Sequence, residues 1–216
     1  MGAFQLWVNL PAAKKMMDPR YQELAADAIP TVRGDGAKVR VIAGEHGGVS
    51  GPVTGIVAGP TCLDVTLEPG AAFEHLTDWA VRAFAYVHAG TAAFGTGGSA
   101  TENAHVVRLG PGDVVRARAG PDGARFLLVA GRPIGEPVTW RGPIVMNTDE
   151  DLCEAFRDLS AGTFVGKQGQ VRAGAGMGAG RWPVLRAGPA TRPGQATVEQ
   201  WAGGGGEEGC GESGGV

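Results

Sequence analysis

The chain is poor in cysteine, in positive charge and in long apolar runs. Its 216 residues hold three cysteines, Cys62, Cys153 and Cys210, without zinc-binding spacing, which favours a reducing compartment over a disulfide framework. The formal net charge is −3, so no basic excess supports direct binding to nucleic acid. No apolar run could span a membrane and no secretory leader is recognisable, so we expect a soluble, intracellular protein.

Glycine is abundant and unevenly distributed. Residues 166–216 contain 16 of the 38 glycines, whereas residues 1–165 carry most of the valine, leucine, isoleucine and phenylalanine. A glycine-rich segment buries too little apolar surface to offset the entropy lost on ordering. We therefore predict that residues 166–216 form a disordered tail.

Short apolar segments separated by turn residues predict an all-β fold, either a sandwich or a barrel of antiparallel strands. In the segment Cys62 to Leu67, side chains alternate between two faces. Leu63, Val65 and Leu67 would face a core. Cys62, Asp64 and Thr66 would face solvent or a cavity. The predicted strands are Val39 to Ala43, Gly55 to Ala58, Cys62 to Leu67, Ala83 to His88, Thr91 to Phe94, His105 to Leu109, Asp113 to Ala117 and Arg125 to Ala130.

One helix is predicted from Asp149 to Leu159. Asn147 or Thr148 can cap its first turn, and the acidic residues that follow complement the positive end of the helix dipole. Its apolar stripe, which includes Leu152 and Ala155, predicts packing against the barrel.

The opening segment Phe4–Leu10 alternates apolar and polar side chains, which predicts a half-buried strand. Phe4, Leu6, Val8 and Leu10 would share one face of that strand. An unpaired strand with an apolar face invites pairing with another chain, so we expect self-association or a protein partner there.

Two motifs resemble the pirin family, whose members contain two consecutive cupin barrels. They are Gln5-Leu6-Trp7-Val8-Asn9 and Gly142-Pro143-Ile144-Val145-Met146-Asn147. The resemblance covers residues 2 to about 165 and implies the linker strand and the second barrel only. It predicts one cupin barrel, a double-stranded β-helix, at residues 38–145, after a crossing strand and linker at 1–37. A C-terminal helix at 146–165 and the tail at 166–216 complete the predicted domains.

A metal-binding cupin usually supplies an H-x-H pair and a glutamate after one turn and another histidine after a second turn. After Glu68-Pro69-Gly70 this chain has Glu74 and His75 but no H-x-H pair, and Val115 stands where the second-motif histidine would fall. Three further histidines, His46, His88 and His105, have no second ligand at suitable spacing within their own strands. We therefore assign no catalytic, cofactor-binding or metal-binding residue.

The resemblance also implies that the iron ligands of pirins lie in the first barrel, upstream of Met1, and that the second barrel is metal-free. Full-length relatives are iron-containing proteins similar to quercetin dioxygenases, and some act in the nucleus as redox-sensitive partners of transcription factors. We expect a cytoplasmic or nuclear, metal-free structural or protein-interaction module without catalytic activity of its own. The alternative is a truncated Fe(II) dioxygenase-like pirin or transcription co-regulator lacking its iron-binding barrel. Binding of a small organic ligand in the barrel cavity without turnover is also left open.

Overall fold

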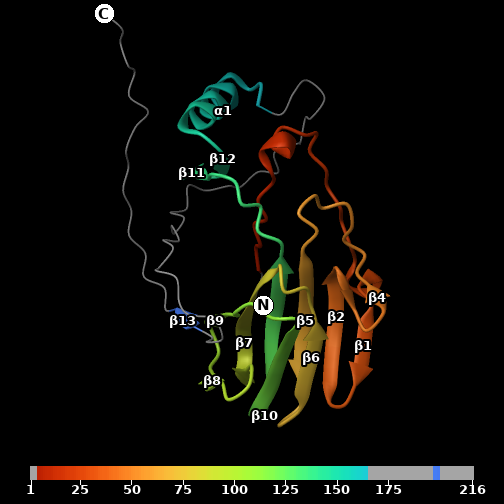
Figure 1. Ribbon diagram of the computed structural model, residues 1–216. Helices are drawn as coiled ribbons and strands as arrows, with labels where there is room; N and C mark the ends of the chain where they lie inside the picture. Colours follow the sequence, from red (N-terminus) through yellow and green to blue (C-terminus); the bar gives the residue numbers. More distant parts are fainter. Residues whose placement is uncertain (1–3, 165–196, 200–216) are drawn as a thin grey trace, which may run out of the picture. The chain divides into compact units, whose positions relative to one another are not determined.

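The computed structural model describes residues 4–164 and 197–199 (Figure 1). Two compact units divide them: residues 4–8, 22–134 and 197–199 form the larger unit, and residues 9–21 and 135–164 form the smaller one. Among the described residues, no helix is long and apolar enough to cross a membrane. The domain boundaries predicted from the sequence stay a prediction.

The larger unit is built from antiparallel strands, as predicted. Their order is β1-β2-β5-β10-β7-β9-β13, with β6 paired to β10 and β8 paired to β7, while β3 and β4 form a separate hairpin. The elements are η2 (Ala26–Ala28), β1 (Thr31–Gly34), β2 (Ala37–Ala43), β3 (Glu45–His46), β4 (Val49–Ser50), β5 (Thr61–Leu67), β6 (Ala72–Leu76), β7 (Arg82–Phe94), β8 (Ala100–Thr101), β9 (His105–Arg108), β10 (Val114–Gly131) and β13 (Thr197–Glu199).

Strand β10 takes part in two sets of pairings. Residues 114–118 pair with β6, whereas residues 124–130 lie between β5 and β7. The register with β7 shifts between these two parts, where Gly90 and Gly123 both have positive φ. A Cβ atom on Gly90 would lie 2.1 Å from the carbonyl oxygen of Gly123, so the close passage of the two strands requires glycine.

The inner faces of these strands form one apolar core. The alternation predicted for β5 is confirmed on this side, because Leu63, Val65 and Leu67 are buried. Phe126 contacts two further rings edge-on, at centroid distances of 5.7 Å to Phe73 and 5.1 Å to Phe94. Each buried aromatic ring removes about 150–250 Å² from water, so these three rings account for much of the core.

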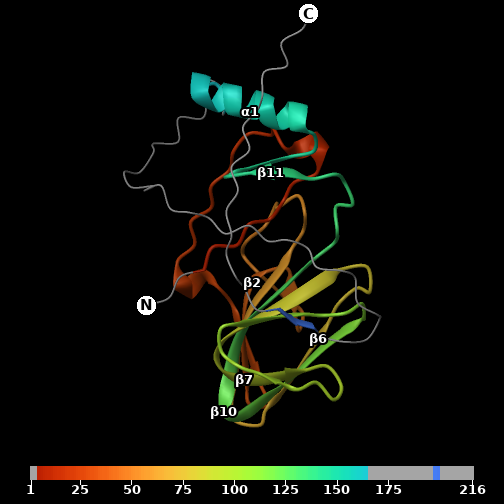
Figure 2. The same ribbon diagram turned by 90° about the vertical axis from the view of Figure 1, so that its left-hand side faces the viewer.

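The smaller unit contains η1 (Ala12–Lys14), the paired strands β11 (Thr139–Arg141) and β12 (Ile144–Met146), and α1 (Asp149–Ala161). The predicted helix is confirmed, with Thr148 as its N-cap: the Thr148 hydroxyl accepts a hydrogen bond from the Asp151 backbone N–H. Its buried side chains, Leu152 and Ala155, pack with Ile144 and Met146 of β12. Helix α1 therefore packs on the β11–β12 hairpin of its own unit (Figure 2), and its predicted packing against the barrel stays a prediction.

The opening segment is not a strand, which corrects the prediction for Phe4–Leu10. A strand needs a hydrogen-bonded neighbour, and no strand of the described chain pairs with this segment. Phe4 instead places its ring against Tyr86 and His88, at centroid distances of 5.4 and 5.1 Å. The side chains of Phe4, Leu6, Trp7 and Val8 are all more than one third exposed, so the segment has no single buried face.

Other predicted strands also differ from those observed. Gly55 to Ala58 forms no strand. The predicted strands on either side of Gly90 are two parts of one long strand, β7, and the predicted strands on either side of Gly120–Gly123 are two parts of another, β10. Several observed strands were not predicted, namely β1, β3, β4, β6, β8, β11 and β12. Within the predicted disordered tail, only Thr197–Glu199 is described, and it differs from the prediction by pairing with β9 as β13. The rest of that prediction lies outside the described residues.

Candidate functional site

His75 lies in the barrel interior because of the alternation of β6. Phe73 and His75 are buried, whereas the residues between and after them are exposed. In the antiparallel register, His75 is the direct partner of Val115 on β10, so the two side chains share the inner face. The position at which a second-motif ligand was expected is therefore apolar, buried and directly opposite the histidine.

His46 reaches the same place from the β3–β4 hairpin. Gly47 and Gly48 connect these two strands with positive φ at both positions, as tight hairpins require. His46 Nδ1 lies 3.1 Å from His75 Nδ1, and the His46 ring stacks on Phe73 at a centroid distance of 5.5 Å. The two imidazoles and the phenyl ring form what we call the histidine pair site: His46, His75 and Phe73.

Burial keeps both rings neutral near pH 7. It lowers the pKa of His75 to about 4, and His46 adds to this effect through charge repulsion. Burial also lowers the pKa of His46. One ring therefore donates its Nδ1–H while the other offers a lone pair, so the pair can exchange a proton or present nitrogen ligands.

The sequence did not reveal this pair, because the two histidines are 29 positions apart and come from different strands. The available signal was Gly47-Gly48, which predicts a tight turn that folds the chain back directly after His46.

The other candidates do not join the histidine pair site. Glu74 faces away from the core, where its carboxylate accepts a hydrogen bond of 2.6 Å from Arg116 Nε. His105 Nδ1 lies 3.0 Å from the backbone oxygen of Asn103. Within residues 4–164 and 197–199, no three His, Cys, Asp or Glu side chains lie close enough to hold a metal ion together.

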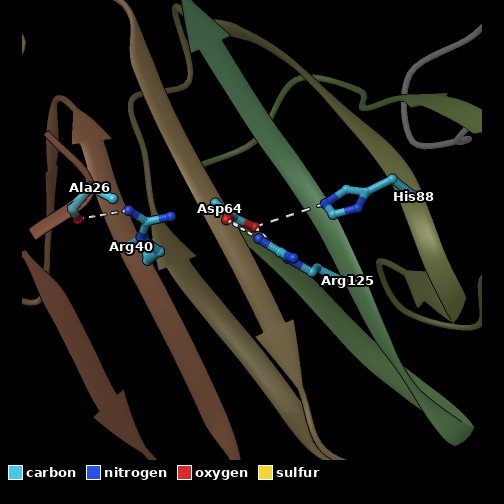
Figure 3. A network of polar contacts seen from close by, with 5 residues as sticks. All are labelled: Ala26, Arg40, Asp64, His88 and Arg125. Carbon is cyan, nitrogen blue, oxygen red and sulfur yellow. Dashed lines mark hydrogen bonds and ion pairs between the residues drawn. The ribbon is translucent and has the colours of Figure 1, made fainter. Parts of the chain in front are cut away.

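A second polar cluster lies on the outer face of the same sheet (Figure 3). Asp64 of β5 was expected to face solvent or a cavity, yet only 6% of it is exposed. Its carboxylate accepts two hydrogen bonds from Arg125 of β10, from Nε at 3.0 Å and from Nη2 at 2.5 Å. On the neighbouring β2, Arg40 donates to the carbonyl oxygen of Ala26, which ties η2 to this face.

His88 completes this outer cluster at a bulge of β7, where the register against β10 shifts. The distance from His88 Nε2 to Asp64 Oδ1 is 3.8 Å, which is too long for a hydrogen bond. Among the described residues, His88 Nε2 is the one buried side-chain nitrogen or oxygen without a hydrogen-bond partner. Burial lowers the pKa of His88, and the Arg125 cation acts in the same direction, while Asp64 opposes them. Hydrogen bonding to Asp64 raises the pKa of Arg125. The outer cluster is therefore an ion pair between a buried carboxylate and a partly exposed guanidinium, with a neutral histidine beside it.

An antiparallel barrel of this topology defines a member of the cupin class, and the comparisons with known proteins agree. Residues 62–165 match the family model described as the pirin C-terminal cupin domain. The chain belongs to the pirin family through this domain.

Several relatives show the same relationship. The chain is 44% identical to a pirin-like protein of Caulobacter vibrioides, over 76% of this chain and 59% of that protein. It is 43% identical to Pirin-1 of Arabidopsis thaliana, over 73% of this chain and 56% of that protein. A crystal structure of quercetin 2,3-dioxygenase from Acinetobacter baumannii matches with a TM-score of 0.68 and 30% identity, over 73% of this chain and 55% of that one. The chain thus spans little more than half the length of these relatives.

Proposed function

We propose that this chain acts as a structural or protein-interaction module rather than as a catalyst. The observation that supports this most is the position of Val115: the side chain opposite His75 is apolar and buried, where a metal-binding barrel would need a ligand. Phe73, Phe94 and Phe126 occupy the interior beside it. Within the described residues, that interior offers two imidazoles and no third ligand for iron.

The interaction partner in this proposal is a protein, and the chain itself is one candidate. Exposed apolar side chains support it: Leu76 and Trp79, at and after the end of β6, are 78% and 73% exposed, and Leu6 in the opening segment is 45% exposed. Because the opening segment is not a strand, association would use these side chains rather than an added strand. Light scattering over a range of concentrations tests self-association, and a monomer at every concentration contradicts it. We place this function in the cytoplasm, the nucleus or both.

A second candidate function is oxygenation chemistry related to that of quercetin dioxygenases. The match to the quercetin 2,3-dioxygenase structure, at 30% identity, favours it. In that case iron would be held by a further barrel, as the pirin resemblance implies, and this chain would contribute the second barrel. Binding of a small organic molecule without turnover is a weaker variant of the same idea.

Iron content and quercetin consumption test whether this chain is a catalyst by itself. The chain is purified without a histidine tag from iron-supplemented cultures and assayed beside the Acinetobacter baumannii quercetin 2,3-dioxygenase as a positive control. We expect far less than one iron atom per chain and no oxygen-dependent loss of quercetin beyond that in buffer. Iron near one atom per chain that survives mild chelation, together with quercetin consumption, would show that the non-catalytic function is wrong.

A further inference from the structure

A groove with an apolar floor lies in the smaller unit, between α1 and residues 12–16. Its volume is about 240 Å³, and every residue that lines it belongs to this unit. Met146 and Ala155 are buried at its base, and the exposed Met16 lines it from the segment after η1. Pockets for drug-sized ligands usually measure about 300–1,000 Å³, so this groove has room for one long side chain rather than for a cofactor.

The rim that α1 contributes is acidic. Asp151, Glu154 and Asp158 line the groove and follow one another at three- and four-residue spacing, so they share one face of the helix over about 10 Å. Helix stability does not explain this arrangement. Asp158 lies near the negative end of the helix dipole, and Glu154 and Asp158 are like charges four residues apart, which destabilises a helix. Among the described residues, none of the three carboxylates takes part in an ion pair.

Lys15 is the one cation among the described residues that line the groove, and its charge is already engaged. Its Nζ donates a hydrogen bond of 2.7 Å to Asn9 Oδ1. Burial lowers the pKa of Lys15, and the negative charge of Glu136 opposes this effect. The carboxylates on α1 therefore leave the groove with an excess of negative charge, which a cation from outside can complement.

We propose that this groove is a docking site for a basic segment of a partner protein, which inserts one arginine side chain between α1 and residues 12–16. The aliphatic part of the arginine lies on Met146 and Ala155, and its guanidinium contacts Glu154 and Asp158 at the rim. Arginine suits these carboxylates better than lysine, because its planar guanidinium offers two parallel N–H groups to a carboxylate. The inference rests on the proposed protein-interaction function and adds the chemistry of the partner.

Fluorescence anisotropy on the full chain tests the site. The probe is a fluorescein-labelled peptide of glycine, serine and three arginines, and a matched peptide carries citrulline, which keeps the shape of arginine and lacks its charge. We expect only the arginine peptide to bind. Its affinity should fall steeply between about 10 mM and 1 M NaCl, as the screening length shortens from about 30 to 3 Å.

Charge removal locates the site on α1. Glu154→Gln/Asp158→Asn should weaken peptide binding about tenfold or more, because hydrogen bonds to charged groups are lost. Asp149→Asn/Glu150→Gln is the matched control: it removes the same charges from the same helix, at positions that do not line the groove, and it should bind the peptide nearly as the wild type does.

The other side of the groove offers a second matched pair. Met16→Lys places a competing cation in the groove and should weaken binding, whereas Met17→Lys adds the same charge outside it and should have a much smaller effect. Equal losses within either pair, or binding of the citrulline peptide, would overturn the proposal.

The remaining outcomes assign the groove to another occupant. Self-association of the wild type that Glu154→Gln/Asp158→Asn abolishes would assign it to a second copy of the chain. No binding by the wild type at millimolar arginine peptide and low salt is expected if the basic residues between 167 and 192 occupy it instead. Either result would overturn the proposal. Neither concerns iron content or association through Leu76 and Trp79, so failure of the groove is distinguishable from failure of the proposed function.

Discussion

The barrel buries polar side chains on its inner side, at β6 and the β3–β4 hairpin, and on its outer side, at β5, β7 and β10. On the inner side, His75 and His46 remain neutral and share one hydrogen bond within an apolar environment. On the outer side, the Asp64 carboxylate accepts two hydrogen bonds from the Arg125 guanidinium. A buried histidine can avoid charge by losing its proton, whereas a carboxylate needs either a proton or a cation. The stability of the inner face should therefore depend on pH, and the stability of the outer face should depend on one ion pair.

The largest expected effect concerns the pH dependence of the inner face. The folded pKa of His75 is about 4 and its ordinary value is 6.5, so the unfolded chain binds more protons between these values. The free energy of unfolding should therefore fall as the pH drops from 6.5 to 4, by an amount on the order of 3 kcal/mol from this group. Urea unfolding at pH 7 and pH 4.5 measures it.

His75→Gln separates His75 from the other titrating groups, because it keeps a hydrogen-bonding side chain and removes the titration. Its stability should depend less on pH than that of the wild type, whereas His105→Gln should follow the wild type. If the slopes of wild type and His75→Gln agree between pH 4.5 and 6.5, the inner face does not hold a neutral histidine in the way described.

The outer face should respond to the loss of its cation. Arg125→Met leaves the Asp64 carboxylate buried without its partner. The free energy of unfolding should therefore fall by about 2 kcal/mol. The loss should be smaller than for a fully buried ion pair, because 45% of the Arg125 side chain is exposed. Chemical denaturation at pH 7 measures the difference. Arg116→Met is the control: Arg116 pairs with Glu74 on an exposed surface, and its loss should not be measurable.

The double variant Asp64→Asn/Arg125→Met sharpens this test, because it removes the buried charge together with its partner. It should recover part of the stability lost in Arg125→Met. Equal losses in Arg125→Met and Arg116→Met would contradict a special role for the outer ion pair.

The smallest expected effect comes from the opening segment, whose Phe4 ring lies against the outer face. Phe4→Ala removes ring contacts with Tyr86 and His88 and should cost about 1 kcal/mol. It should also expose His88 to water, so that the pKa of His88 rises toward its ordinary value. A proton titration of the His88 ring by nuclear magnetic resonance checks this. Trp79→Ala, at a position 73% exposed, should leave that titration unchanged.

Features set by neighbours along the chain could be predicted from the sequence. The inward face of β5 and the Thr148 cap of α1 follow from side-chain alternation and helix-terminus preferences, which act over a few residues. The prediction of a strand at Phe4–Leu10 rested on the same alternation and was wrong. A β-strand needs a hydrogen-bonded neighbouring strand, and alternation of side chains does not indicate whether one is present.

Features set by distant residues could not be predicted from one sequence. Asp64 is buried because Arg125, 61 positions away, neutralises it, and His75 meets His46 only after the hairpin and β6 have formed. Neither pairing leaves a local signal in the sequence. The family resemblance identified the cupin barrel but carried no information about these contacts.

The position of β10 has a consequence for the order in which the barrel forms during synthesis. Residues 124–130 separate β5 from β7, so these two strands have no common neighbour until that part of the chain has left the ribosome. Until then the apolar faces of β2, β5 and β7 lack the strand that closes the core. Contacts between residues so far apart also form slowly, because a long loop must close first. The nascent barrel is therefore exposed to misassociation and chaperone binding until the last long strand is complete.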